Sequence, residues 1–127
     1  MANEIKLTLT GSVVNGDFTD DIKPGALQVT QAAQGMQSQI VTVTSSAAVT
    51  ISTTNVGTLG WLYARNLDAT NWVTWGPQSS TGGIIGIGRL EISEWAALRI
   101  SPGTTIMALA STTGAANCKV LFKFYED

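Results

Sequence analysis

Carboxylates that lie close together in the sequence are the first candidates for chemistry. Glu91 and Glu94 form one such pair, and Asp20 and Asp21 form another. A pair of carboxylates can serve as the acid and the base of glycoside hydrolysis. The sequence contains no histidine, so the commonest general base is absent. Neighbouring acids on polar loops are usually solvated, and we therefore expect no catalytic residues and no enzymatic activity.

Two further segments have only part of a ligand-binding pattern. Asp17, Asp20 and Asp21 have the charge of a calcium loop, but they lack the ligand spacing and the closing glutamate. The glycine-rich run 82–88 lacks the Gly-Lys-Ser/Thr sequence of a phosphate loop. Cys118 is the only cysteine, so an internal disulfide and a thiolate zinc site are both excluded. The sequence predicts no metal and no cofactor.

The four tryptophans can bind a ligand without any reactive group. Together with Tyr63 they could form a platform on which sugar rings stack. Trp61 and Trp72 sit within apolar segments, so we interpret both as buried packing residues. Trp75 and Trp95 border predicted turns. We expect one of these two to anchor a contact with another molecule.

The elements that must position these residues are strands, because apolar residues recur at every second position in one segment after another. Strands are predicted at 5–10, 26–30, 36–44, 49–51, 59–66, 72–76, 84–92, 96–100, 105–110 and 119–125. We predict a turn or loop at 13–21, a turn at 24–25, and a hairpin in which Asp68 and Asn71 hold the reversal between 59–66 and 72–76.

A turn signal about every ten residues is typical of β-sandwiches. The sequence therefore predicts a single all-β domain over residues 1–127. We expect a two-sheet β-sandwich of jelly-roll type with about eight to ten short antiparallel strands.

The charge pattern limits the partners that the chain can bind. The formal net charge is −2, and the seven basic residues are scattered rather than clustered, so nucleic acid is not an expected partner. Apolar runs are far shorter than the roughly 20 residues of a membrane helix, and the N-terminus has no secretion signal. We expect a soluble protein with no membrane partner. Only 13% of residues are charged, and such a surface is poorly protected against association.

Three segments carry a resemblance to a known class of proteins. They are residues 60–76 (Gly-Trp-Leu-Tyr-Ala-Arg-Asn-Leu-Asp-Ala-Thr-Asn-Trp-Val-Thr-Trp-Gly), 97–102 (Ala-Leu-Arg-Ile-Ser-Pro) and 105–110 (Thr-Ile-Met-Ala-Leu-Ala). The region 59–125 resembles small virion structural proteins of tailed bacteriophages, of the head decoration or cement type. It departs from them at 92–95, where those proteins often have a Pro-Gly-Glu turn.

The resemblance implies a capsid decoration or cement protein that binds and stabilises the assembled phage head. It implies that the partner is the major capsid protein of the same virus, and that the chain is a homo-oligomer, commonly a trimer. The expected location is the virion, assembled in the host cytoplasm. A tail- or fibre-associated virion protein and a carbohydrate-binding β-sandwich module are the alternatives.

We expect the contacts to come from edge strands and from the N-terminal segment, because strand edges can pair with a neighbour and a short tail can lie across one. The expected interface residues are Met1, Ala2, Asn3, Glu4, Trp75 and Trp95.

Overall fold

The computed structural model describes residues 3–111 and 117–127. Within these residues the chain forms ten strands and no helix, and the paired strands are antiparallel, so the predicted all-β class is confirmed. The strands are β1 (Asn3–Asn15), β2 (Phe18–Gln31), β3 (Met36–Val43), β4 (Val49–Thr50), β5 (Leu59–Asn66), β6 (Val73–Pro77), β7 (Gly88–Leu90), β8 (Trp95–Arg99), β9 (Ile106–Ala110) and β10 (Cys118–Glu126).

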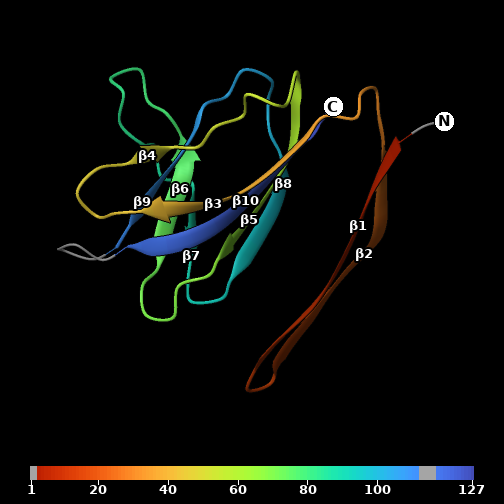
Figure 1. Ribbon diagram of the computed structural model, residues 1–127. Coiled ribbons are helices and arrows are strands. Elements are labelled where there is room, and N and C mark those ends of the chain that lie inside the picture. Colours follow the sequence, from red (N-terminus) through yellow and green to blue (C-terminus); the bar gives the residue numbers. More distant parts are fainter. Residues whose placement is uncertain (1–2, 112–116) are drawn as a thin grey trace. The chain divides into compact units, whose positions relative to one another are not determined.

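The chain divides into two compact units, Met1–Gln34 and Gly35–Asp127. The first unit is a long hairpin in which β1 pairs with β2, drawn in red and brown in Figure 1. The second unit holds the other eight strands of the described residues. The single domain expected over residues 1–127 stays a prediction.

The hairpin corrects two local predictions. The turn or loop predicted at 13–21 is confirmed as a tight turn, in which Gly16 has a φ of 61°. Its predicted extent is wrong, because β1 continues to Asn15 and β2 begins at Phe18. The turn predicted at 24–25 is also wrong, because both residues lie inside β2. The register shifts opposite them, between Leu9 and Gly11. Such a bulge accommodates a proline, which has no N–H for the ladder, and a glycine with a φ of 86° at Gly25.

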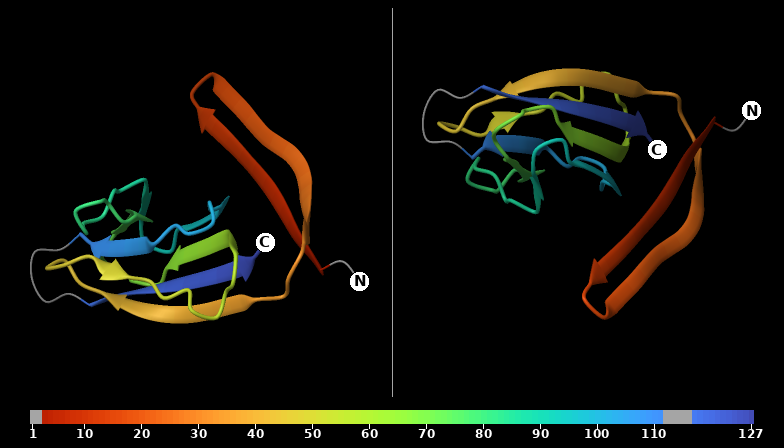
Figure 2. Two further views of the ribbon diagram at one scale, coloured as in Figure 1. Left: turned by 90° about the horizontal axis from the view of Figure 1, so that it is seen from above. Right: turned by 90° about the horizontal axis from the view of Figure 1, so that it is seen from below.

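Two four-stranded sheets make up the second unit (Figure 2). One has the strand order β3-β10-β5-β8, and the other has the order β4-β9-β6-β7. Buried side chains from both sheets form one hydrophobic cluster. Val120, Phe122 and Phe124 of β10 are buried in it.

The hairpin predicted between 59–66 and 72–76 is wrong. Strands β5 and β6 occupy nearly those ranges, but β5 pairs with β8 and β10, whereas β6 pairs with β7 and β9. The turn between them carries the chain from one sheet to the other. An alternating pattern determines which face of a strand is buried, but it does not identify the strand's neighbour.

Asn66 holds this crossing in place. Its side chain is fully buried. The amide Nδ2 donates hydrogen bonds to the carbonyl oxygens of Asn71 at 2.8 Å, Leu90 at 3.1 Å and Glu91 at 3.2 Å. Its Oδ1 accepts a hydrogen bond from the backbone N–H of Asp68 at 2.9 Å. One buried side chain therefore ties the β5–β6 turn to the end of β7.

We predict that Asn66→Ala lowers the free energy of unfolding by about 2–3 kcal/mol, because buried carbonyl groups lose their donor. Asn55→Ala is the control, since Asn55 is exposed, and it should change the value by less than about 0.5 kcal/mol. Urea unfolding followed by tryptophan fluorescence measures both. Equal losses in the two variants would show that the Asn66 contacts do not stabilise the fold.

Candidate binding surface

The face of the β3-β10-β5-β8 sheet that points away from the core carries aromatic and basic side chains. Directly paired residues of antiparallel strands lie on the same face, so the register identifies the residues that alternate with the core positions. This outer face consists of Met36, Ser38, Ile40, Thr42, Trp61, Tyr63, Arg65, Trp95, Ala97, Arg99, Lys119, Leu121, Lys123 and Tyr125. It contains every basic residue after position 34 except Arg89.

One row of the outer face has an exposed apolar side chain at each end, Ile40 and Trp95. Ile40 pairs with Leu121, and Leu121 pairs in turn with Arg65. Arg65 pairs with Trp95, whose side chain is 53% exposed at the end of the row. The ring of Trp95 stacks on that of Tyr63, with centroids 6.1 Å apart and an angle of 27° between the planes. This arrangement offers a partner a flat aromatic surface beside a cation.

The other tryptophans have different environments. Trp61 is only 8% exposed, so its predicted burial is confirmed, although it lies on the outer face and outside the core cluster. Trp72 is half-buried, and the guanidinium carbon of Arg89 lies 4.0 Å from its ring centroid. Trp61 is therefore buried outside the core that lies between the two sheets.

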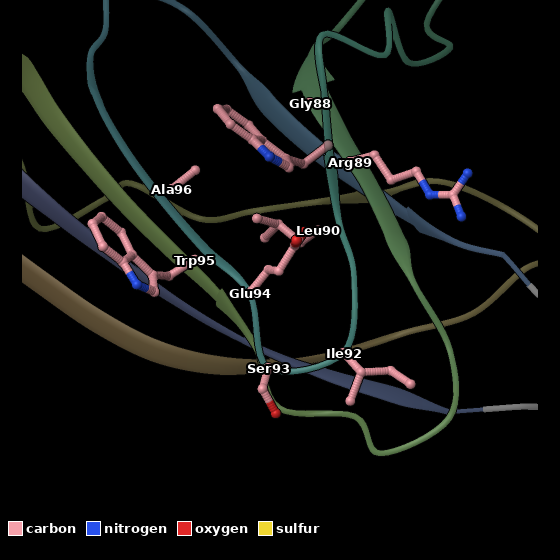
Figure 3. Close-up of a pocket in the computed structure, with 9 residues that line it drawn as sticks. Gly88, Arg89, Leu90, Ile92, Ser93, Glu94, Trp95 and Ala96 are labelled. Atoms are coloured by element: carbon pink, nitrogen blue, oxygen red, sulfur yellow. The ribbon is translucent and has the colours of Figure 1, made fainter. Parts of the chain in front are cut away.

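A groove of about 500 Å³ lies between the end strand β7 of one sheet and the end strand β8 of the other (Figure 3). Its lining residues are Trp75, Gly88, Arg89, Leu90, Ile92, Ser93, Glu94, Trp95 and Ala96. Trp75 is 2% exposed and packs in the core cluster, whereas Trp95 is exposed. The fold therefore brings the two predicted anchor residues to one groove, which the sequence pattern did not indicate.

The wall of the groove requires a glycine at position 88. A Cβ atom on Gly88 would lie 2.5 Å from Nε1 of Trp75, closer than two such atoms can approach. Within the described residues, Nε1 of Trp75 is buried without a hydrogen-bond partner. The groove therefore has a buried N–H donor in its wall, and buried donors usually have an acceptor. In the sequence, the glycine that this contact requires cannot be distinguished from the other glycines of the run 82–88.

The carboxylates of the loop between β7 and β8 have structural contacts. Oε2 of Glu94 accepts a hydrogen bond from the backbone N–H of Glu91 at 2.8 Å. The carboxylate of Glu91 forms an ion pair with Arg89. Ser93 lies between them with a φ of 65°, in the left-handed region that non-glycine residues seldom adopt. The pair considered for glycoside hydrolysis therefore shapes the loop at the groove.

Strand β8 leaves one edge of its backbone unpaired within the described residues. The N–H of Asn66 donates to the carbonyl of Glu94, and the N–H of Ile100 donates to the carbonyl of Gly60. Even-numbered positions of β8 therefore face β5. The backbone groups of the odd-numbered positions, Trp95, Ala97 and Arg99, point to the free edge, because the direction alternates along an antiparallel strand. An extended segment of a partner could pair there.

The remaining predicted residues have these positions. Met1 and Ala2 lie outside the described residues, and Asn3 and Glu4 begin β1. Their interface role stays a prediction.

Within residues 3–111 and 117–127, no cluster of three or more carboxylate, thiol or imidazole groups could hold a metal ion. Asp21 instead pairs with Lys23 at 2.7 Å. The described part also has no helix long and apolar enough to span a membrane.

Two groups near the β5–β6 turn have shifted pKa values. The backbone N–H of Thr70 donates to Oδ1 of Asp68 at 2.8 Å, and that of Asn71 donates at 2.7 Å. These hydrogen bonds hold the pKa of Asp68 below its ordinary value and confirm its predicted role in the turn. Burial raises the pKa of the Cys118 thiol, and the charge of Asp68 raises it further. A neutral, buried thiol is a poor nucleophile.

Comparison with known proteins adds no assignment to this geometry. No protein-family model matches the chain, and no match was found among curated proteins.

The Asp68 contacts predict a pH-dependent contribution to stability. Because the folded pKa lies below the unfolded value near 3.8, this contribution is complete above that value and is lost as pH falls through the folded pKa. Asp68→Asn should therefore be less stable than the wild type at neutral pH, and the difference should shrink in acid. Urea unfolding midpoints measured across this range test the sign. A difference that stays constant into acid would contradict it.

Proposed function

We propose that residues 35–127 form a jelly-roll β-sandwich. The register pairs β3 with β10, β4 with β9, β5 with β8 and β6 with β7. These are the pairs of one long hairpin whose two arms are folded around a common core. Further pairing of β10 with β5 and of β9 with β6 joins them into two sheets. This order supports the jelly-roll topology, which viral capsid and lectin domains both use.

We further propose that the chain is a virion structural accessory protein, a decoration or cement protein that binds and stabilises the assembled phage head without catalysis. The resemblance in region 59–125 supports this role. The observation that carries it is the combination at β8 of a free strand edge, an exposed tryptophan and a groove. In this proposal the partner is the major capsid protein, the location is the virion after assembly in the host cytoplasm, and the chain is a homo-oligomer.

The proposed contact follows from the geometry of β8. An extended segment of the coat protein adds to the free edge, where main-chain hydrogen bonds supply affinity. Its side chains enter the groove, and Trp95 packs on it as the anchor. The basic residues of the outer face, Arg65, Lys119 and Lys123, favour an acidic coat surface.

We predict saturable binding of the purified chain to particles of its own virus, at a fixed ratio to the coat protein. Trp95→Ala should weaken binding by at least about tenfold, because buried interface tryptophans commonly contribute about 2 kcal/mol or more. Leu67→Ala is the control, since Leu67 is also exposed but does not line the groove. Co-sedimentation measures the occupancy. Equal binding by both variants would exclude Trp95 as the anchor, and binding to tails alone would favour the tail-associated alternative.

The N-terminal segment is tested in the same assay. We expect that deletion of residues 1–4 lowers occupancy without unfolding the protein, because a short terminal segment can lie across a neighbour. Unfolding midpoints should match those of the full chain. Unchanged occupancy would remove Met1, Ala2, Asn3 and Glu4 from the interface.

Carbohydrate binding is a second candidate, and the exposed stack of Trp95 on Tyr63 favours it. Aromatic faces of this kind can pack against sugar rings. If the stack binds glycans, tryptophan fluorescence will change saturably when oligosaccharides are titrated, and Trp95→Ala will abolish the change. A flat titration across a panel of neutral and acidic oligosaccharides would eliminate this function.

A further inference from the structure

The β1–β2 hairpin has one apolar face and one polar face. Residues paired directly across the two strands lie on the same side of the ribbon, so the register assigns each residue to a face. The apolar residues on one side are Ile5, Leu7, Leu9, Val13, Phe18, Ile22, Leu27 and Val29. The opposite side carries Lys6, Thr8, Ser12, Thr19, Asp21 and Gln28. Toward the tip the separation is incomplete, because Asp20 pairs with Val13 on the apolar side and Val14 lies on the polar side.

The apolar face is exposed to a degree that an isolated ribbon does not tolerate. Leu9 is 48% exposed, Leu27 is 51% exposed and Phe18 is 60% exposed. A two-stranded hairpin alone is at best marginally stable in water, because it needs a further layer over its apolar side. This face therefore requires a cover.

We propose that the hairpin of a second copy of this chain covers it, with the two apolar faces packed together. A second hairpin has the same length, the same twist and the same apolar face, so one two-fold contact covers both copies. Thirteen residues of β1 extend roughly 44 Å. Two such faces bury on the order of 1,200 Å² in total, which reaches the range of stable specific interfaces.

The charges determine the direction in which the two hairpins run. The tip carries Asp17 and Asp20, with the ion-paired Asp21 and Lys23 close behind, whereas Glu4 and Lys6 lie near the base. Residues 1–34 contain four acidic and two basic residues. A parallel arrangement would bring two acidic tips together and repel. An antiparallel arrangement places each tip beside the partner's base, so this is the arrangement that we propose.

This contact goes beyond the proposed attachment to a shell, since it concerns copies of the chain and needs no virus particle. It also differs from the trimer that the resemblance implies, because a three-fold axis would place the hairpins parallel. A monomeric chain would rule out the hairpin dimer without bearing on the β8 contact. A chain that does not bind particles would rule out the β8 contact without bearing on the dimer.

Sedimentation equilibrium of the full chain tests the association. The wild type should be a dimer at micromolar concentration. Leu9→Lys places a charge on the apolar face and should raise the dimer dissociation constant by about tenfold or more. Thr8→Lys adds the same charge to the opposite face one residue away and should leave the dimer intact. Fluorescence of the buried Trp61 and Trp75 checks that residues 35–127 stay folded. A monomeric wild type, or equal effects of both variants, would overturn the proposal.

Cross-linking with a short bis-maleimide tests the direction. The native Cys118 is fully buried, so it should not react in the folded protein. Leu9→Cys lies near the middle of the ribbon, where an antiparallel pair brings the two copies together, and it should give a covalent dimer. Phe18→Cys lies at the tip and should not. Cross-linking through Phe18→Cys as well as through Leu9→Cys would indicate parallel hairpins, as in a trimer, and would refute the antiparallel pair.

Discussion

The shared hydrophobic core of strands β3–β10 is the constraint on which the other features of the second unit depend. Each sheet buries one face in this core, and Phe122, Phe124 and Val73 are among the side chains that fill it. The outer faces and the end strands are therefore the surfaces left for a partner. Since β7 ends one sheet and β8 ends the other, closure of the core also creates the groove between them.

Polar and close-packed contacts then determine the shape of this groove. Asn66 ties the end of β7 to the β5–β6 turn, and Gly88 allows β7 to approach Trp75. Glu94 and Glu91 are engaged within the loop that leads into β8, and Glu91 pairs with Arg89 of β7. The carboxylates that could suggest catalysis in the sequence thus shape the groove, which Trp95 lines as an exposed aromatic residue.

Part of this architecture could be predicted from the sequence. Alternation identified β5 and β10 almost to the residue, because one face of each is buried in the core and the pattern records that burial. Strand neighbours could not be predicted, because any two strands with apolar faces can pair, and β5 and β6 belong to different sheets. The sequence predicts a turn at residues 24–25, where the structure has a bulge in β2, because Pro and Gly favour both turns and bulges. The position of Trp75 and Trp95 in one groove depends on these sheet orders, so it could not be predicted either.

We propose that the free edge of β8 is where this protein contacts its partner. Amide hydrogen exchange, compared between the free chain and the chain bound to the phage particles that we propose as its partner, tests this most directly. We expect exchange at Trp95, Ala97 and Arg99 to slow strongly on binding, because their edge amides gain partners, while the central strand β10 exchanges slowly in both states. Equal exchange rates along β8 in the free and bound chain would contradict the account.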